Sequence, residues 1–233
     1  MGEPESVGSQ LSRLFPGAHA GTLRHLKREA REQSFGRRAI LRSRGIALPP
    51  FIVLEGHVID RRVAETGQVY AALIGSPGYL GGIRSVSDPD AEPFYELVAL
   101  TDGSWATWDP RVVRELAKAD AGLALGLLDQ SAEFAAILNI RLDERSFESA
   151  RQRMAAILTR YGPVIFDTRH PVAQRADLAA MIGTSRVMMG RALRDLETEG
   201  LVKREHGGGI RVLDQERLAS LVVVASPVGA PTI

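Results

Sequence analysis

The stretch that decides the fold lies near the C-terminus and reads RADLAAMIGTSRVMMGRALRDLETEGLVKREHGGGIRVLD, residues 175–214. A short helix carrying Leu178 and Ile182 runs to Gly183, where glycine can adopt the left-handed backbone of a tight turn. Thr184 or Ser185 can then cap a second helix through its hydroxyl oxygen. The sequence therefore predicts two helices that cross at a short turn.

Two short β-type runs follow this helix pair. They flank residues 206–209, His-Gly-Gly-Gly, which favour the turn of a β-hairpin. Lys203, Arg204 and Arg211 lie on these runs and could contact DNA phosphates. Together the elements form the pattern of a winged helix-turn-helix.

The second helix presents an outward surface able to enter the major groove of DNA. Its arginines could meet guanine O6 and N7 or phosphate oxygens. The residues predicted to contact DNA from this helix and its cap are Thr184, Ser185, Arg186, Val187, Gly190, Arg191 and Arg194. The alternative is a helical hairpin with a glycine-rich turn that merely packs on a larger body, and the appended wing makes that alternative less attractive.

Upstream, from about residue 39 to 108, short β-type runs alternate with Gly, Pro and Asp, as in a small antiparallel sandwich or barrel. Trp105 and Trp108 bracket the last run and are expected in its core. Before this region, residues 8–15 predict a short helix, and residues 22–35 show helical spacing.

After the β region, helical periodicity returns. Asp109 and Pro110 open a long helical segment that is rich in leucine and ends near Asn139, and a second helix is expected at about residues 143–160. The leucine stripe could pack within the monomer, but it is richer than one sheet face needs, which favours a subunit interface.

Composition excludes several classes of function. The chain has 233 residues and no cysteine, so a disulfide framework, a thiolate metal site and a cysteine-ligated iron-sulfur cluster are absent. Its five histidines show no paired metal-ligand spacing, although haem ligation by one of them stays open. No nucleophile elbow, P-loop or dinucleotide fingerprint is present, so no enzyme activity is expected. Neither a secretory signal nor a run of about 18 uninterrupted apolar residues is found, so we expect a cytoplasmic protein without a membrane span.

The order of these segments resembles the Crp/Fnr family, the cyclic-AMP receptor protein and its relatives, from about Leu11 to Asp214. Residues 35–59, with turn glycines Gly45 and Gly56, resemble the family's early strands, and GYLGGIRSV, residues 78–86, resembles the approach to its phosphate-binding cassette. The resemblance implies an α+β protein with an N-terminal cyclic-nucleotide-binding-like β-sandwich or jelly roll, a long dimerisation helix and a C-terminal winged helix-turn-helix. The expected boundaries are 1–116, 117–161 and 162–233.

The recognition helix is similar to the family's Ser-Arg-Glu pattern followed by Gly-Arg, so the resemblance assigns base contacts to Arg186 and Arg191. Val187 stands where the family has glutamate. Valine cannot accept a hydrogen bond from cytosine N4 but can touch a thymine methyl group, so an altered half-site is expected.

The effector cassette departs further from the family. The places of the ribose-binding Glu and the phosphate-binding Arg-Ser pair look like Gly82, Pro93 and Phe94, so cyclic AMP is not expected as a ligand. The candidate effector residues are Gly81, Gly82, Arg84, Phe94 and Tyr95.

The sequence thus predicts a homodimeric, sequence-specific DNA-binding transcription regulator with a degenerate effector domain. Duplex DNA is the expected partner, with RNA polymerase and an unknown small-molecule effector as further candidates. Two alternatives stay open. One is a small-molecule sensor that signals through protein contacts without DNA binding, and the other is constitutive DNA binding without a ligand.

Overall fold

The structure is a computed structural model that describes residues 6–63, 69–90, 95–162, 175–206 and 208–222. The chain divides into two compact units. The first comprises Met1–Asp60 and Leu73–Ala136, and the second comprises Arg61–Ala72 and Ile137–Ala230.

Within the described residues, most helices and strands occur in separate runs, in the α+β order that the sequence predicts. The helices are α1 (Val7–Leu14), α2 (Ala20–Glu29), α3 (Arg84–Ser87), α4 (Pro110–Ala119), α5 (Ala121–Phe147), α6 (Ala150–Tyr161), α7 (Arg175–Met181), α8 (Arg186–Thr198) and α9 (Gln215–Ser220). The strands are β1 (Arg31–Phe35), β2 (Ile40–Arg42), β3 (Phe51–Glu55), β4 (Val58–Val63), β5 (Val69–Gly75), β6 (Leu80–Gly81), β7 (Glu96–Ala99), β8 (Gly103–Thr107), β9 (Val202–Arg204) and β10 (Ile210–Val212).

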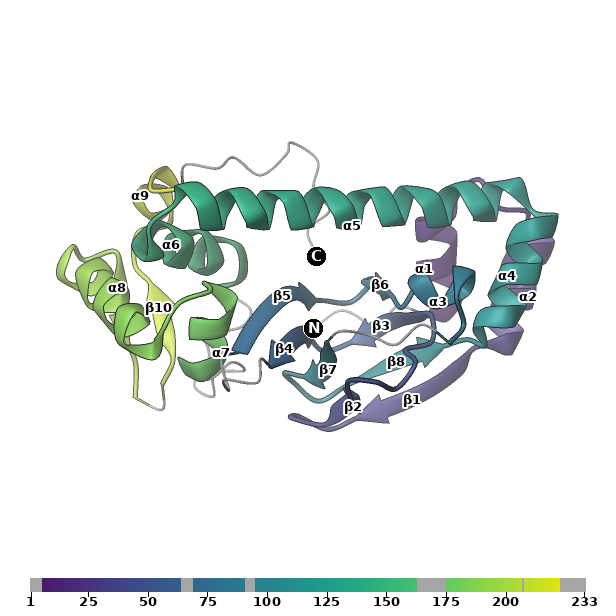
Figure 1. Ribbon diagram of the computed structural model, residues 1–233, viewed down its shortest axis with the longest axis horizontal. Coiled ribbons are helices and arrows are strands. Elements are labelled where there is room, and N and C mark those ends of the chain that lie inside the picture. The colour runs from purple at the N-terminus through teal and green to yellow at the C-terminus, as the bar shows by residue number, and fades with distance from the viewer. Residues whose placement is uncertain (1–5, 64–68, 91–94, 163–174, 207, 223–233) are drawn as a thin grey trace. The chain divides into compact units, whose positions relative to one another are not determined.

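Two four-stranded sheets form the β region, which confirms the predicted sandwich (Figure 1). One sheet has the order β1-β8-β3-β6 and the other β2-β7-β4-β5. The pairings β1–β8, β3–β8, β3–β6 and β2–β7 are antiparallel. The apolar run over residues 51–59 becomes two strands because Gly56 turns the chain with φ +81°, a conformation that costs glycine little.

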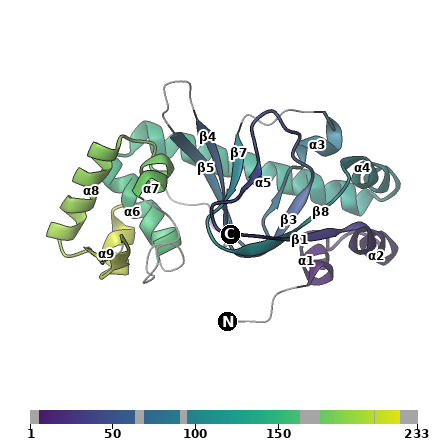
Figure 2. The same cartoon turned by 90° about the horizontal axis from the view of Figure 1, so that it is seen from below.

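Strand β3 separates two apolar cores, since successive side chains of a strand point to opposite faces. Phe51 and Val53 pack with Trp105 between the sheets, whereas Ile52 and Leu54 pack with Trp108 under the helices. Figure 2 shows α1, α2 and α4 gathered at the same end of this unit. Both tryptophans are buried, as predicted, and Trp108 Nε1 donates to the Leu26 carbonyl at 2.7 Å.

The predicted helix over residues 22–35 is wrong in its second half. Helix α2 ends at Glu29, and Arg31–Phe35 forms strand β1. The strand pairs along its whole length with β8, from Arg31 opposite Thr107 to Phe35 opposite Gly103. Pairing with a distant strand outweighs the local helical spacing, because so short a segment has little intrinsic helix stability.

The predicted boundaries of the long helical segment are also corrected. Asp109 caps α4 as expected, but this helix ends before Asp120. Asp120 Oδ1 accepts hydrogen bonds from the Gly122 and Leu123 amides, and a new helix, α5, starts there. Helix α5 then continues to Phe147 rather than ending near Asn139. The next helix, α6, consequently begins at Ala150, where Ser149 and Gln152 form a capping box.

Helix α5 is the one helix in the described ranges whose length and composition would allow it to cross a membrane, a feature that counting uninterrupted apolar residues did not reveal. Asp129 and Glu133 interrupt its apolar sequence. A single helix that passes such a test is weak support for a membrane span, and the helix belongs to the fold identified below.

The second unit contains the C-terminal helices and the hairpin of β9 and β10. Most of its buried apolar side chains come from α6, α7, α8 and the hairpin, with Leu218 added from α9; Met154, Ile157 and Leu158 of α6 are fully buried. Figure 2 shows α7 and α8 meeting at an angle within this unit. The predicted helix-turn-helix is therefore present.

Candidate nucleic-acid interface

The turn between α7 and α8 is built by the residues that the sequence singled out. Gly183 has φ +63°, the left-handed region that side chains disfavour. The amide of Thr184 donates to the Ala179 carbonyl at 3.1 Å, which closes the end of α7. Ser185 is the N-cap of α8, and its hydroxyl accepts from the Met188 amide at 3.2 Å. Of the two predicted caps, Ser185 is therefore the one used.

Helix α8 divides into a buried and an exposed face. Met189, Ala192, Leu193 and Leu196 are buried in the unit. The exposed face carries Arg186, Val187, Arg191 and Arg194. A Cβ added at Gly190 would meet no atom within 4 Å, so the surface there is open and shallow. The predicted base-reading residues thus share one solvent-facing surface.

Sequence reasoning missed one apolar residue of this surface. Met188 is 43% exposed beside Val187, which is 65% exposed, and Arg191 Nη1 lies 4.0 Å from the Met188 sulfur. Met188 and Met189 are adjacent residues of the same type, so the residue type does not show which of them is exposed. Placing Met189 on the buried face of the helix would have identified Met188 as the exposed one.

The wing is an antiparallel hairpin, with Ile210 opposite Arg204 and Arg211 opposite Lys203. Its arginines are engaged by acidic side chains. Arg204 Nε donates to Glu197 Oε2 at 2.7 Å, and Arg211 Nη2 lies 2.8 Å from Glu205 Oε1. Hydrogen bonds from Arg204 lower the pKa of Glu197. Binding of a phosphate by Arg204 would therefore compete with an existing ion pair, whereas Lys203 is exposed.

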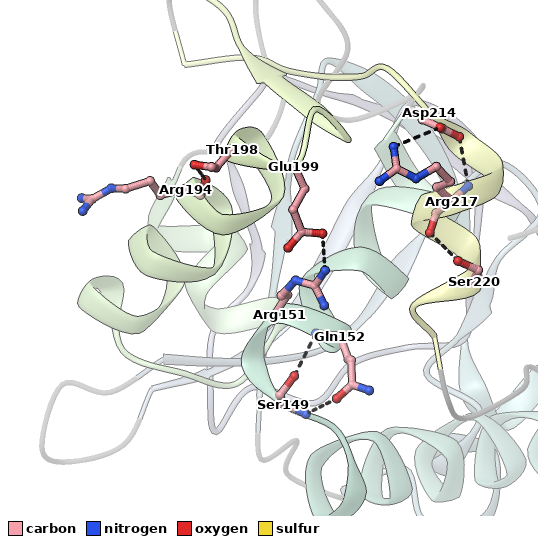
Figure 3. A network of polar contacts seen from close by, with 9 residues as sticks. All are labelled: Ser149, Arg151, Gln152, Arg194, Thr198, Glu199, Asp214, Arg217 and Ser220. Atoms are coloured by element: carbon pink, nitrogen blue, oxygen red, sulfur yellow. Dashed lines mark hydrogen bonds and ion pairs between the residues drawn. The ribbon is translucent and has the colours of Figure 1, made fainter.

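Polar contacts brace the domain behind α8 (Figure 3). Arg151 of α6 pairs with Glu199 at the C-cap of α8, and Asp214 caps α9 by accepting from the Arg217 amide at 3.0 Å. In the same view the Arg194 side chain reaches outward from α8, while Arg217 lies against Asp214. These contacts fix α8 on its scaffold and leave its outer face to solvent.

A buried ionic cluster joins the end of α5 to the helix-turn-helix. Glu144 accepts from Arg141 Nη1 at 2.9 Å and from Arg160 Nη2 at 3.4 Å. Both Glu144 and Arg141 are buried. Arg153 Nε donates to the Ile182 carbonyl at 2.7 Å, directly before the turn glycine. The turn is thus held by a side chain of α6.

The candidate effector residues lie in the first unit. Gly81, Gly82, Arg84 and Tyr95 line one cavity of about 660 Å³, and Phe94 lies outside the described residues. Steric crowding explains why both Gly81 and Gly82 lack a side chain. A Cβ on Gly82, whose φ is +70°, would stand 2.0 Å from the Pro49 carbonyl oxygen, and one on Gly81 would overlap the Phe51 ring.

Two further cations of this cavity escaped sequence analysis. Arg114 and Lys118 line it from α4. Their spacing of four residues on one helix was the available signal, but only the packing of α4 shows which face they share. Among the described residues, no group of three or more His, Asp or Glu side chains could hold a metal ion.

Comparison with known proteins supports the assignment of the class. Residues 152–221 match the family model of the Crp-like helix-turn-helix domain. The chain also has the fold of solved Crp/Fnr-type structures, which confirms the predicted architecture and the resemblance seen in the sequence. The class so defined is that of proteins with the Crp/Fnr-type fold and a Crp-like helix-turn-helix domain over residues 152–221.

Several solved structures share this fold. FixK2 from Bradyrhizobium japonicum is 19% identical, with a TM-score of 0.70 over 84% of this chain and 99% of FixK2. CLP from Xanthomonas campestris, a global regulator responsive to c-di-GMP, is 16% identical, with a TM-score of 0.70 over 83% and 99% of the two chains. A Crp/Fnr-family regulator from Thermus thermophilus is 23% identical, with a TM-score of 0.62 over 82% and 97%. No curated protein matches this chain significantly in sequence.

Proposed function

We propose that this chain is a cytoplasmic, homodimeric regulator that binds a two-fold symmetric DNA site through helix α8. The observation that carries the proposal is the exposed face of α8, where Arg186, Val187, Arg191 and Arg194 surround the open surface at Gly190. Arg186 and Arg191 read bases, while Thr184, Ser185, Arg194 and the wing residues Lys203, Arg204 and Arg211 position the domain on phosphates. The proposed domains are an effector domain at 1–116, a dimer helix region at 117–161 and a DNA-binding domain at 162–233.

The sequence and exposure of α5 support the homodimer. Six residues at alternating spacings of three and four are all exposed in the single chain: Leu125, Leu128, Ala132, Ala135, Asn139 and Leu142. This spacing is that of a coiled-coil seam. A polar residue at one seam position, here Asn139, fixes the register and number of helices in such assemblies.

A two-fold dimer would place two α8 helices in successive major grooves, about one helical turn of DNA apart. RNA polymerase is the natural further partner of a regulator bound in this way. The substitution of valine for the family's glutamate favours a half-site with a thymine at the position that Val187 faces.

Selection of bound sequences from a random duplex library tests the proposal directly. The full chain should enrich a two-fold symmetric motif. Arg191→Ala should weaken binding to it by about 1–3 kcal/mol and relax the preference at one base pair. Arg217→Ala is the matched control, since Arg217 is an exposed arginine of the same domain held by Asp214 on α9. It should keep the wild-type motif.

Absence of any enriched motif, together with an affinity for DNA that does not fall with salt, would refute DNA binding, because phosphate contacts always release counterions. That result would favour the alternative of a sensor that signals through protein contacts.

A further inference from the structure

The cavity of about 660 Å³ in the first unit is formed by elements far apart in the sequence. It is lined from β6, α3, α4 and α5, together with Tyr79 and Tyr95. Its volume is in the range of cavities that enclose drug-sized ligands, roughly 300–1,000 Å³. Its lining combines cationic and apolar side chains, and this combination defines the class of ligand that it can bind.

One side of the cavity is cationic. Arg84 of α3 and Arg114 and Lys118 of α4 line it, and none of its described lining residues is acidic. Arg114 Nη1 also donates to the Ser87 carbonyl at 3.2 Å. This bond joins α4 to α3 and fixes the position of one guanidinium at the rim. Guanidinium groups bind carboxylates and phosphates through paired hydrogen bonds.

Another part of the lining is apolar and comes mainly from α5. Leu127, Leu128 and Phe134 line the cavity there, and Ile83 and Val86 extend the apolar surface from the region of α3. Such walls favour a ligand with a hydrocarbon or aromatic body, because the free energy gained by burying apolar surface depends on its area and not on direction. A sugar with several hydroxyl groups would leave its polar groups without partners against these walls.

We propose that this cavity binds an organic anion with an apolar body, namely an aliphatic or aromatic carboxylate, with the carboxylate toward Arg84, Arg114 and Lys118. The body of the ligand lies against Leu127, Leu128 and Phe134 of α5. Lys118 Nζ lies 2.7 Å from Glu115 Oε1, so a carboxylate competes with this exposed ion pair for Lys118, whereas Glu115 does not line the cavity. The cations attract the anionic head, and a neutral molecule of the same shape lacks that interaction.

The cavity also connects the ligand to the subunit interface, an inference that rests on the proposed function. Leu128 is 62% exposed, lines the cavity and occupies a seam position of α5. A ligand that contacts Leu128 therefore changes the side chain that the partner helix would meet. Ligand binding and dimer geometry are coupled through this residue.

The probe for the test is 8-anilinonaphthalene-1-sulfonate, an amphipathic anion, titrated into the full chain by fluorescence. We expect saturable binding at one site per chain, with displacement by decanoate or by 1-naphthoate. The stronger of the two competitors tells an aliphatic from an aromatic ligand. Decanol, which lacks the charge, and cyclic AMP should compete at least tenfold more weakly.

Two variants and a control connect this binding to the cavity. The double variant Arg114→Gln and Lys118→Gln should weaken probe binding at least tenfold. Arg111→Gln, an exposed arginine of the same helix outside the cavity, should leave it unchanged. Ser131→Trp, at a cavity-lining position on the surface of α5, should block the site by filling it.

The proposal is overturned if the probe does not saturate, if decanol competes as well as decanoate, or if the double variant and Ser131→Trp bind like the wild type. DNA binding is followed separately with the selected duplex. A ligand that binds without altering DNA affinity would refute the coupling alone, while failure of the wild type to bind DNA would refute the proposed function and leave the ligand result standing.

Discussion

At the scale of single residues, Val187 makes the most specific prediction about the DNA site of the proposed regulator. Its side chain is 65% exposed on a helix whose other outward residues are mainly arginines. An exposed valine gains little in water, but it can bury the methyl group of a thymine in the major groove. The neighbouring Met188 adds a second apolar contact at the same end of the helix.

We therefore expect thymine-to-uracil replacement at one position of the selected half-site to weaken wild-type binding about three- to fourfold, as burial of one methyl group contributes about 0.8 kcal/mol. The same replacement should have no effect on Val187→Ala. Fluorescence anisotropy with the paired duplexes measures both. An equal loss in wild type and variant would assign the methyl contact to another residue, and Met188→Ala would then identify it.

Asp60 is a second informative residue, because its carboxyl group is buried in the first unit. The Tyr79 hydroxyl donates to Asp60 Oδ2 at 3.3 Å, and Oδ1 has no partner among the described residues. Burial raises the pKa of Asp60 to about 7, partly offset by the Tyr79 hydrogen bond. The folded protein thus holds this proton more tightly than the unfolded chain does.

A raised folded pKa means that the stability linked to Asp60 is complete below about pH 4 and declines as pH rises to about 7. Asp60→Asn removes this titration. Its stability relative to wild type should improve between about pH 4 and pH 8 by up to about 4 kcal/mol, since each pKa unit corresponds to about 1.4 kcal/mol. Urea unfolding at both pH values measures the difference, with exposed Asp129→Asn as the control. Parallel pH curves for Asp60→Asn and wild type would contradict the prediction.

At the scale of elements, the junction between α5 and the helix-turn-helix depends on Glu144. This buried carboxylate accepts hydrogen bonds from Arg141 of α5 and Arg160 of α6, so it ties the two helices together. Removal of an acid from a buried ion pair leaves an uncompensated charge, which is costlier than loss of a surface pair.

Glu144→Ala should therefore destabilise the second unit by about 3–5 kcal/mol. Glu133→Ala, an exposed acidic position on the same helix, should change stability by less than about 0.5 kcal/mol. Thermal and urea unfolding of both variants test the difference. Equal, small effects would show that solvent reaches the cluster and that it does not hold α6 on α5.

At the scale of the whole molecule, the proposed seam of α5 would determine whether two chains assemble. Leu125 and Leu142 are 60% and 63% exposed in the single chain, which is unfavourable for large apolar side chains in water. Pairing of two α5 helices would bury them, and two recognition helices would then be presented together.

The double substitution Leu125→Lys and Leu142→Lys should convert the proposed dimer to a monomer at micromolar concentration, because charges at seam positions are desolvated on pairing. Gln130→Lys adds the same charge away from the seam, where Glu133 lies within hydrogen-bonding distance, and should leave the dimer intact. Analytical ultracentrifugation gives the masses. The monomeric variant should also lose at least tenfold in affinity for a symmetric site, and a variant that remains dimeric would place the interface elsewhere.

Elements whose signals are local could be predicted from the amino-acid sequence. The turn glycine Gly183, the cap Ser185 and the hairpin after Gly200 follow from backbone preferences within a few residues, so the helix-turn-helix and its wing were predictable. The short β-type runs separated by Gly, Pro and Asp likewise indicated the sandwich, since these residues end strands through local backbone preferences.

Features that depend on distant partners became visible only in the folded chain. Arg31–Phe35 is a strand because β8 lies beside it, and the buried Glu144 cluster exists because α6 returns along α5. The pairing of Arg204 with Glu197 and the cationic wall of Arg114 and Lys118 also arise from packing. Local sequence cannot specify such contacts, because their free energy belongs to groups that meet only once the chain has folded.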